Sequence, residues 1–254
     1  MSYIKPKKYY GQHFLTDQSI AERIVNSLNP SLNYILEIGP GKGVLTQYLV
    51  KKDNLYVIEI DEECAHHIKL NYPELNDRLF TEDFLKFDFE KIPSSQFAII
   101  GNFPYNISSQ IFFKILENKD QVIEVVCMLQ KEVAQRIVSP PGNRDYGILS
   151  VLLQSYFNIE YLFTVKPGSF FPPPKVYSGV IRLTRNENIK LDCDDKLFFK
   201  VVKTSFNQRR KKLRNSLLSL TKNPISQEIF SKRPEQLHYT DFINITNLIS
   251  TLSK

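Results

Sequence analysis

The segment from Gly101 to Ser109 has the residue types of a site that holds an amino group on a flat ring. It follows a short apolar stretch, residues 97–100, that is typical of a buried strand. Asn102 can accept a hydrogen bond through its amide oxygen. Pro104 has a fixed φ and keeps its carbonyl as an acceptor, and Tyr105 offers a planar face for stacking. Taken alone, the segment fits a plain strand-to-helix turn equally well.

Acidic residues mark the ends of three other strand-like stretches. They are Glu37, Glu59 and Asp83. Because the carboxyl ends of parallel strands meet at the crevice where α/β proteins bind ligands, we expect these acids to share one site with Asn102. Glu59 is placed to accept hydrogen bonds from ribose hydroxyls, and Asp83 from an adenine amino group.

A glycine-rich turn, residues 39–43, follows the first of these acids. Gly39 and Gly41 permit a tight turn and a close approach of the backbone to a ligand. The dinucleotide-binding fingerprint requires a further glycine where this chain has Val44. An acid beside the turn would repel a pyrophosphate and attract a cation. The sequence therefore predicts an adenosine-type cofactor without phosphates.

The spacing of apolar residues indicates strands that alternate with helices. Expected strands are residues 34–38, 55–60, 79–82, 97–100, 122–129, 161–165 and 176–183. Expected helices between them are 17–28, 44–52, 62–71, 110–116, 131–138 and 148–157. This alternation predicts an α/β fold with a mostly parallel, doubly wound sheet. The later pattern is wholly helical, at 197–206, 213–220 and 242–252. We therefore predict a catalytic domain at 1–190 and a small all-helical domain at 191–254.

Charge is distributed unevenly along the chain. The net charge of the whole chain is +6. The part from Lys196 onward carries 12 Lys and Arg against 3 Asp and Glu, a net charge of +9. The remainder carries 21 Lys and Arg against 24 Asp and Glu, a net charge of −3. The helical part contains a cationic cluster, made of Arg209, Arg210, Lys211, Lys212 and Arg214. Such a cluster predicts binding of a nucleic acid, with a solvated helical face as the alternative. Residues 1–12 contain Lys7 and Lys8 among tyrosines. This composition predicts an N-terminal arm that contacts phosphates and bases.

Composition argues against several other classes of protein. No apolar run reaches the roughly 18 residues that span a bilayer, and the polar N-terminal region has no signal-peptide pattern. The cysteines, Cys64, Cys127 and Cys193, lie far apart, which indicates reduced thiols and argues against a zinc site. We therefore expect a cytoplasmic protein with no membrane partner and no metal.

Seven segments of the chain follow the order and spacing of one enzyme family. They are residues 11–15 (GQHFL), 37–43 (EIGPGKG), 57–61 (VIEID), 102–109 (NFPYNISS), 128–134 (MLQKEVA), 146–151 (YGILSV) and 170–176 (FFPPPKV). In these segments the chain resembles the KsgA family of small-subunit (16S) rRNA adenine N6,N6-dimethyltransferases. The resemblance implies a Rossmann-like methyltransferase fold and S-adenosylmethionine as cofactor. It also implies that a monomer methylates two adjacent adenosines in the 3′-terminal hairpin loop of 16S rRNA, within the immature small subunit.

Carried over residue by residue, the resemblance assigns roles to single positions. Cofactor contacts fall on His13, Leu15, Gly39, Gly41, Glu59, Asp83 and Asn102. Contacts with a flipped adenine fall on Asn102, Pro104, Tyr105 and Phe170. Asn102 and the carbonyl of Phe103 or Pro104 would accept the amino N–H bonds, and Tyr105 and Phe170 would stack on the two faces. His13 and Phe103 depart from the residues usual in the family, which are Asn and Leu or Pro.

Three alternatives stay open at the level of sequence. The 23S rRNA adenine methyltransferases of the macrolide-resistance type share the early segments. A DNA adenine methyltransferase would suit the segment around Asn102 alone. A non-catalytic relative could serve as a nucleic-acid-binding assembly or transcription factor. The segments at 146–151 and 170–176 favour the 16S family, and the intact acids favour an active enzyme.

Overall fold

The computed structural model describes residues 4–186, 191–221 and 226–252 of the 254-residue chain. These residues form two compact units. The first comprises Met1–Ala134 and Glu160–Arg185, and the second comprises Gln135–Ile159 and Asn186–Lys254. The predicted domain boundary at residue 190 lies outside the described residues, and the division at 190/191 stays a prediction.

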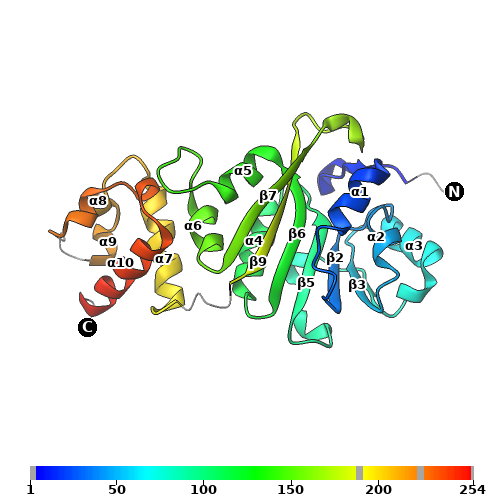
Figure 1. Cartoon of the computed structure of the whole chain (residues 1–254), viewed down its shortest axis with the longest axis horizontal. Coiled ribbons are helices and arrows are strands. Elements are labelled where there is room, and N and C mark those ends of the chain that lie inside the picture. Colours follow the sequence, from blue (N-terminus) through cyan, green and yellow to red (C-terminus); the bar gives the residue numbers. More distant parts are fainter. Residues whose placement is uncertain (1–3, 187–190, 222–225, 253–254) are drawn as a thin grey trace. The chain divides into compact units, whose positions relative to one another are not determined.

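A seven-stranded sheet organises the first unit (Figure 1). In spatial order its strands are β4 (Leu79–Phe80), β3 (Asn54–Ile58), β2 (Tyr34–Ile38), β5 (Phe97–Asn102), β6 (Val122–Gln130), β9 (Ser178–Arg185) and β7 (Phe157–Val165). Strands β2 to β6 pair in parallel, and β9 runs antiparallel to β6. The chain leaves β2 toward β3 and β4 and returns to β5 on the other side of β2. The carboxyl ends of β2 and β5 therefore flank the topological switch point, where such sheets bind ligands.

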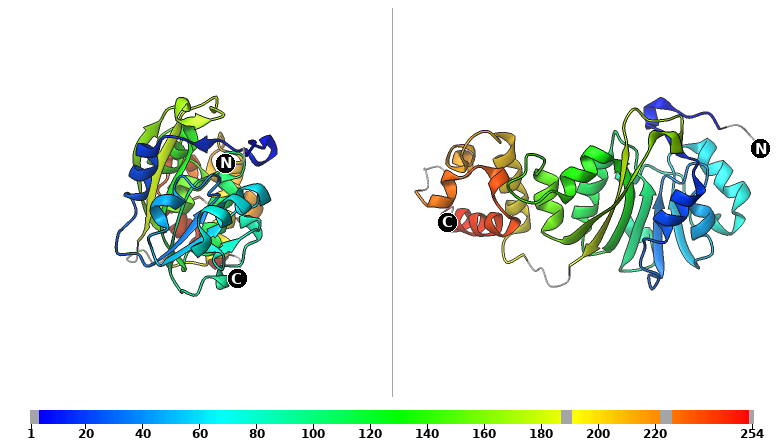
Figure 2. Two further views of the ribbon diagram at one scale, coloured as in Figure 1. Left: turned by 90° about the vertical axis from the view of Figure 1, so that its right-hand side faces the viewer. Right: turned by 45° about the horizontal axis from the view of Figure 1, so that its top comes forward.

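Both faces of this sheet are covered, because neighbouring strand residues are equally buried. On one face Ile35 packs in a core cluster with residues of α1 (Gln18–Val25), α2 (Thr46–Leu49) and α3 (Glu62–Asn71). The next residue, Leu36, points to the other face and is also fully buried. Burial on both sides explains the nearly continuous apolar strands of the sequence. Figure 2 shows the strands side by side in one twisted layer.

The helices of this unit begin where the sequence places capping residues. Asp17 accepts hydrogen bonds from the N–H groups of Ser19 and Ile20, and it caps α1 as predicted. Asp61 caps α3 in the same manner. The chain then continues through α4 (Ser108–Glu117), which begins at the end of the segment from Gly101 to Ser109, and α5 (Lys131–Val138), directly after β6.

Several predicted elements differ in extent from the observed ones, most clearly at two places. The helix predicted at 148–157 is α6 (Ile148–Gln154), and β7 already begins at Phe157, four residues before the predicted strand. An apolar run fits a helix and a buried strand equally well, and here the helix ends at Ser155, whose hydroxyl donates to the carbonyl of Leu152. The helix predicted at 44–52 contains only α2, because Gly43 has a left-handed φ of 79° and residues 51–53 leave the helix.

A two-stranded ribbon lies beside the main sheet. Its strands are β1 (Phe14–Leu15) and β8 (Phe170–Phe171), paired antiparallel as Phe14 with Phe171 and Leu15 with Phe170. This ribbon ties the segment that follows the N-terminal arm to the proline-rich segment near residue 172.

The second unit is helical in its C-terminal part, as predicted. The second unit contains the end of α5, then α6, and in its C-terminal part α7 (Asp195–Asn207), α8 (Leu213–Ser216), α9 (Leu218–Thr221) and α10 (Tyr239–Leu252). Phe198, Val201 and Phe242 are fully buried, and the ring of Phe206 lies 6.0 Å from that of Phe242. Within the described residues, no helix has the length and apolar character required to cross a membrane.

Candidate active site

A cavity of about 230 Å³ lies at the carboxyl ends of β2, β3 and β5. All of its lining residues belong to the first unit. The cavity brings together most of the positions that the sequence predicts for the site. These are His13, Leu15, Gly39, Gly41, Glu59, Asp83, Asn102, Pro104 and Tyr105. The convergence of separate strand ends, expected from the fold, is therefore observed in one concave site.

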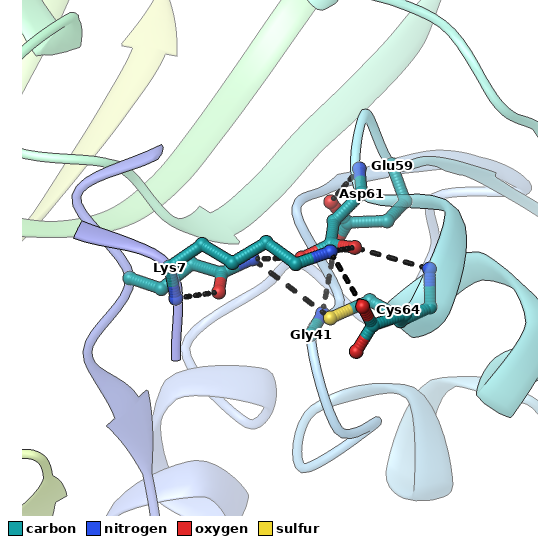
Figure 3. A network of polar contacts seen from close by, with 7 residues as sticks. Lys7, Gly41, Glu59, Asp61 and Cys64 are labelled. Atoms are coloured by element: carbon teal, nitrogen blue, oxygen red, sulfur yellow. Dashed lines mark hydrogen bonds and ion pairs between the residues drawn. The ribbon is translucent and has the colours of Figure 1, made fainter. Parts of the chain in front are cut away.

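The acid at the end of β3 holds the glycine-rich turn (Figure 3). Glu59 is buried, and its two carboxylate oxygens accept hydrogen bonds from the backbone N–H groups of Gly41 (3.1 Å) and Asp61 (2.9 Å). Burial raises the pKa of Glu59, and the two backbone hydrogen bonds oppose that rise. A carboxylate oxygen has two lone pairs, so Glu59 keeps acceptor capacity toward the cavity.

Gly41 has no room for a side chain. Its φ is 56°, in the left-handed region, and a Cβ atom there would lie 2.9 Å from the ring of Phe14. The turn can therefore approach both Glu59 and the ribbon strand β1 only with glycine at this position.

Two buried oxygens in the cavity wall have no hydrogen-bond partner among the described residues. One is Oε1 of Glu37, whose other oxygen accepts from the hydroxyl of Thr46 at 2.8 Å. Burial raises the pKa of Glu37 to about 8; the Thr46 hydrogen bond opposes this effect, and the nearby Glu59 adds to it. A buried acceptor of this kind fits a cationic or hydrogen-donating ligand, because the ligand would satisfy it.

The second unpaired oxygen is Oδ1 of Asn102. The amide nitrogen of this residue donates to the backbone carbonyl of His13 at 2.9 Å, which fixes the side chain so that its oxygen is the free acceptor. The next residue, Phe103, is fully buried and packs edge-on against Phe112 at 5.9 Å. The departure from the family at Phe103 therefore concerns packing under the site.

Tyr105 is held by a neighbour that the sequence did not single out. Its hydroxyl lies 2.5 Å from the hydroxyl of Ser178, a fully buried residue at the start of β9. Burial raises the pKa of Tyr105, and the Ser178 hydrogen bond opposes this effect. The ring of His13 lies 5.6 Å from the Tyr105 ring, and His13 Nδ1 lies 2.7 Å from the carbonyl oxygen of Pro172.

The structure does not place every predicted residue in the cavity wall. Phe170 is only 4% exposed, belongs to the core cluster, and is not among the described residues that line the cavity.

The residues predicted to bind RNA differ in exposure. Lys7 forms ion pairs with Asp61 and Glu63, whereas Lys8 is exposed. In the second unit, Arg209 donates to the carbonyl of Arg144, and the other members of the cationic cluster are exposed.

Other residues of the site were missed by the sequence analysis. Ile60 and Phe84 line the cavity directly after Glu59 and Asp83, and Ile60 is 42% exposed. An apolar residue directly after an acid at a strand end could have been predicted to form a cavity wall against a planar ligand. Gln12 and Asp61 lie in the segments at 11–15 and 57–61, and their residue types did not predict that they bond to each other. The described residues contain no group of three or more His, Cys, Asp and Glu suited to a metal ion.

Comparisons with known proteins agree with this geometry. The family model described as ribosomal RNA adenine dimethylase matches residues 4–252. The chain is 54% identical to the ribosomal RNA small subunit methyltransferase A of Flavobacterium johnsoniae, over 98% of this chain and 97% of that protein. The crystal structure of a dimethyladenosine transferase from Plasmodium falciparum has the same fold, with a TM-score of 0.78, 23% identity, and coverage of 95% and 98% of the two chains.

The crystal structure of the 23S rRNA methyltransferase ErmE is also similar in fold. Its structure gives a TM-score of 0.63 and 26% identity over 92% of this chain and 99% of that one. The predicted Rossmann-like methyltransferase fold is thus confirmed. In sequence the chain is much more similar to the small subunit methyltransferase A of Flavobacterium johnsoniae, at 54% identity, than to ErmE, at 26%. The chain belongs to the ribosomal RNA adenine dimethylase family.

Proposed function

We propose that this protein transfers methyl groups from S-adenosylmethionine to the N6 atoms of two adjacent adenosines in the 3′-terminal hairpin loop of small-subunit (16S) rRNA. The family match and the 54% identity to a small subunit methyltransferase support this reaction. As finer parts of the proposal, the protein acts as a monomer in the cytoplasm, and its substrate is the rRNA within the immature small subunit.

The cavity has the donor and acceptor groups that the cofactor requires. S-adenosylmethionine, when bound, supplies an electrophilic methyl group on a sulfonium and carries an ammonium. The unpaired Glu37 oxygen can share a hydrogen bond with such a group, and Glu59 has acceptor capacity for ribose hydroxyls. Asp83 lines the cavity and would accept from the adenine amino group, and the backbone of Gly39 and Gly41 permits close approach. His13 and Leu15 complete the predicted contacts.

The target adenine is held by the segment after β5. An adenine N6 is a weak nucleophile because its lone pair is delocalised into the ring. The Asn102 oxygen and the carbonyl of Phe103 or Pro104 accept its two N–H bonds, which concentrates the lone pair on nitrogen and orients it. Tyr105 stacks on one face of the flipped base. Phe170, which is buried outside the cavity wall in this structure, would have to move to stack on the other face. Positioning and charge stabilisation dominate over general base catalysis here.

The single observation that carries this role is the buried Oδ1 of Asn102, which has no hydrogen-bond partner among the described residues. We predict that Asn102→Ala lowers kcat by at least about 100-fold, because an acceptor aimed at the reacting amine is lost. The affinity for S-adenosylhomocysteine should change by less than about 3-fold, since other residues make most contacts with the cofactor. Single-turnover methylation and calorimetric titration measure the two effects. Asn76→Ala, at an exposed position, is the control. Near-normal methyl transfer by Asn102→Ala would contradict the proposal.

Acceptor choice separates the proposed substrate from the alternatives. Purified small subunits that lack the modification should take up labelled methyl groups, and 50S subunits and duplex DNA should not. Uptake by 50S subunits would indicate the 23S activity, and uptake by duplex DNA would indicate a DNA methyltransferase. A protein that binds rRNA without methylating it would be an assembly factor.

A further inference from the structure

Lys7 has its charge directed at the protein, although its position in a basic, tyrosine-rich arm predicts a contact with RNA. Its ammonium lies 2.6 Å from Oδ1 of Asp61 and 3.1 Å from Oε1 of Glu63 (Figure 3). The Asp61 side chain is fully buried, and the Lys7 side chain is 22% exposed. A cation that neutralises a buried carboxylate is not available to a phosphate without leaving that carboxylate unpaired.

Gln12 makes a second link between the arm and the same carboxylate. Its amide nitrogen donates to Oδ2 of Asp61 at 2.8 Å, and its amide oxygen accepts from the backbone N–H of Lys7, also at 2.8 Å. Both oxygens of Asp61 are thus bonded to the arm. Burial alone would raise the pKa of Asp61, but the hydrogen bonds from Lys7 and Gln12 outweigh it and hold the pKa below its ordinary value.

An apolar contact supports these polar links. Ile4 is 3% exposed and forms a small cluster with Phe14 and Cys64, apart from the main core. The arm is therefore anchored at Ile4, Lys7 and Gln12, and the residues between and after these anchors, such as Tyr10, form one wall of the cavity.

Asp61 also bonds to two further elements, the end of β3 and the start of α3. Its backbone N–H donates to Oε1 of Glu59, whose other oxygen holds the turn at Gly41. Its side chain accepts from the N–H of Glu63 and caps α3. One buried residue thus joins the arm, the end of β3 and the helix that follows it.

From this geometry we propose that Lys7, Gln12 and Asp61 form a latch that holds the arm as a wall of the cofactor cavity, so that Lys7 is a positioning residue for the cofactor and not a phosphate ligand. The inference rests on the proposed function, because it assigns S-adenosylmethionine to that cavity. The latch slows escape of the bound molecule, because the wall must swing away before the cavity opens.

Dissociation of S-adenosylhomocysteine, measured by stopped flow, tests the latch. Lys7→Met should raise the dissociation rate constant by about three- to five-fold, the range expected for loss of a partly exposed ion pair. Lys7→Arg should restore the wild-type rate, because it keeps the charge. Lys5→Met, an exposed lysine of the same arm, is the matched control and should leave the rate unchanged. Thermal unfolding confirms that each variant is folded.

The salt dependence of the dissociation rate distinguishes an ion pair that holds the arm from a purely structural role of Lys7. Since the ion pair is partly exposed, the wild-type dissociation rate should rise between about 0.05 and 0.5 M salt, and the Lys7→Met rate should not. Gln12→Glu, which sets a carboxylate against Asp61, should raise the rate more than Lys7→Met does.

The outcomes separate the latch from the proposed function. S-adenosylhomocysteine could leave Lys7→Met at the wild-type rate, while the RNA affinity of the variant and the salt dependence of its RNA binding both fall. That result would make Lys7 a phosphate ligand and overturn the latch. Unchanged rates in both Lys7→Met and Gln12→Glu also overturn the latch. A wild-type protein that binds no S-adenosylhomocysteine overturns the proposed function itself.

Discussion

At the scale of single residues, the cavity is defined by acceptors that the protein leaves unsatisfied. Unpaired buried oxygens cost free energy, so their occurrence at two positions of one cavity, Glu37 and Asn102, points to a ligand that supplies donors or positive charge. Asn102 was predicted from its residue type and its place after a strand. The orientation of its amide depends on the carbonyl of His13, 89 positions away in sequence, which no local pattern contains.

Glu37 makes stability depend on pH. Its pKa is about 8 in the folded protein, against about 4.3 in an unfolded chain. The folded state therefore keeps a proton that the unfolded state releases, and the free energy of unfolding falls as pH rises between these values. The contribution is at most about 1.4 kcal/mol per pH unit.

Glu37→Gln should remove this contribution, because it keeps the acceptor for Thr46 and cannot ionise. We expect urea denaturation at about pH 5.5 and pH 7.5 to show a smaller loss of stability in the variant than in the wild type. Glu62→Gln, an exposed residue, is the control and should keep the wild-type slope. Equal slopes in wild type and Glu37→Gln would mean that Glu37 is ionised throughout this range.

At the scale of elements, the site depends on strands that approach very closely. Residues 97–100 were expected to form a buried strand before Asn102, and β5 confirms this strand and extends it to Asn102 itself. The register that sets Ile38 opposite Gly101 brings the ends of β2 and β5 together. The alternation of strands and helices predicted a parallel sheet, but the insertion of β9 between β6 and β7 was not predictable, because pairing partners depend on contacts distant in sequence.

Gly101→Ala tests this close approach. A Cβ atom on Gly101 would lie 2.5 Å from the carbonyl oxygen of Ile38, which is backbone and cannot turn away. We expect a loss of about 1–3 kcal/mol in the free energy of unfolding, and lower methyl transfer because Asn102 is displaced. Gly168→Ala, where a Cβ would meet nothing within 4 Å, is the matched control for urea denaturation. Wild-type stability of Gly101→Ala would show that the strands can separate without cost.

At the scale of the whole molecule, charge is distributed unevenly between the two ends of the chain. The part from Lys196 onward carries a net charge of +9 and the remainder −3, from 12 against 3 and 21 against 24 charged residues. Composition alone predicted this division and its interpretation as an RNA-binding part beside a cofactor-binding part. It could not predict that Arg209 donates to the carbonyl of Arg144 and lies 4.0 Å from Glu235.

The exposed members of the cationic cluster should set the salt dependence of RNA binding. Replacing Arg210, Lys211, Lys212 and Arg214 by Glu should abolish rRNA binding at physiological salt and leave the affinity for S-adenosylhomocysteine unchanged. Replacing the same four by Ala should reduce the slope of log K against log salt by up to about 3, since each phosphate contact contributes roughly 0.7–0.9. Fluorescence titrations at several salt concentrations measure both effects. Lys51→Ala with Lys69→Ala, two exposed lysines of the first unit, form the control. An unchanged slope would remove the cluster from RNA recognition.

The pairing of β1 with β8 has a consequence for the order in which the protein is made. Leu15 lies in the wall of the cavity, and its partner Phe170 is synthesised 155 residues later. While the chain grows on the ribosome, the acids of β2 and β3 and the Asn102 segment all emerge before the strand that secures this wall. A nascent chain therefore displays most of the chemistry of the enzyme before it has a finished cavity. The pairing that secures Leu15 in the cavity wall forms only after the proline-rich segment has left the exit tunnel.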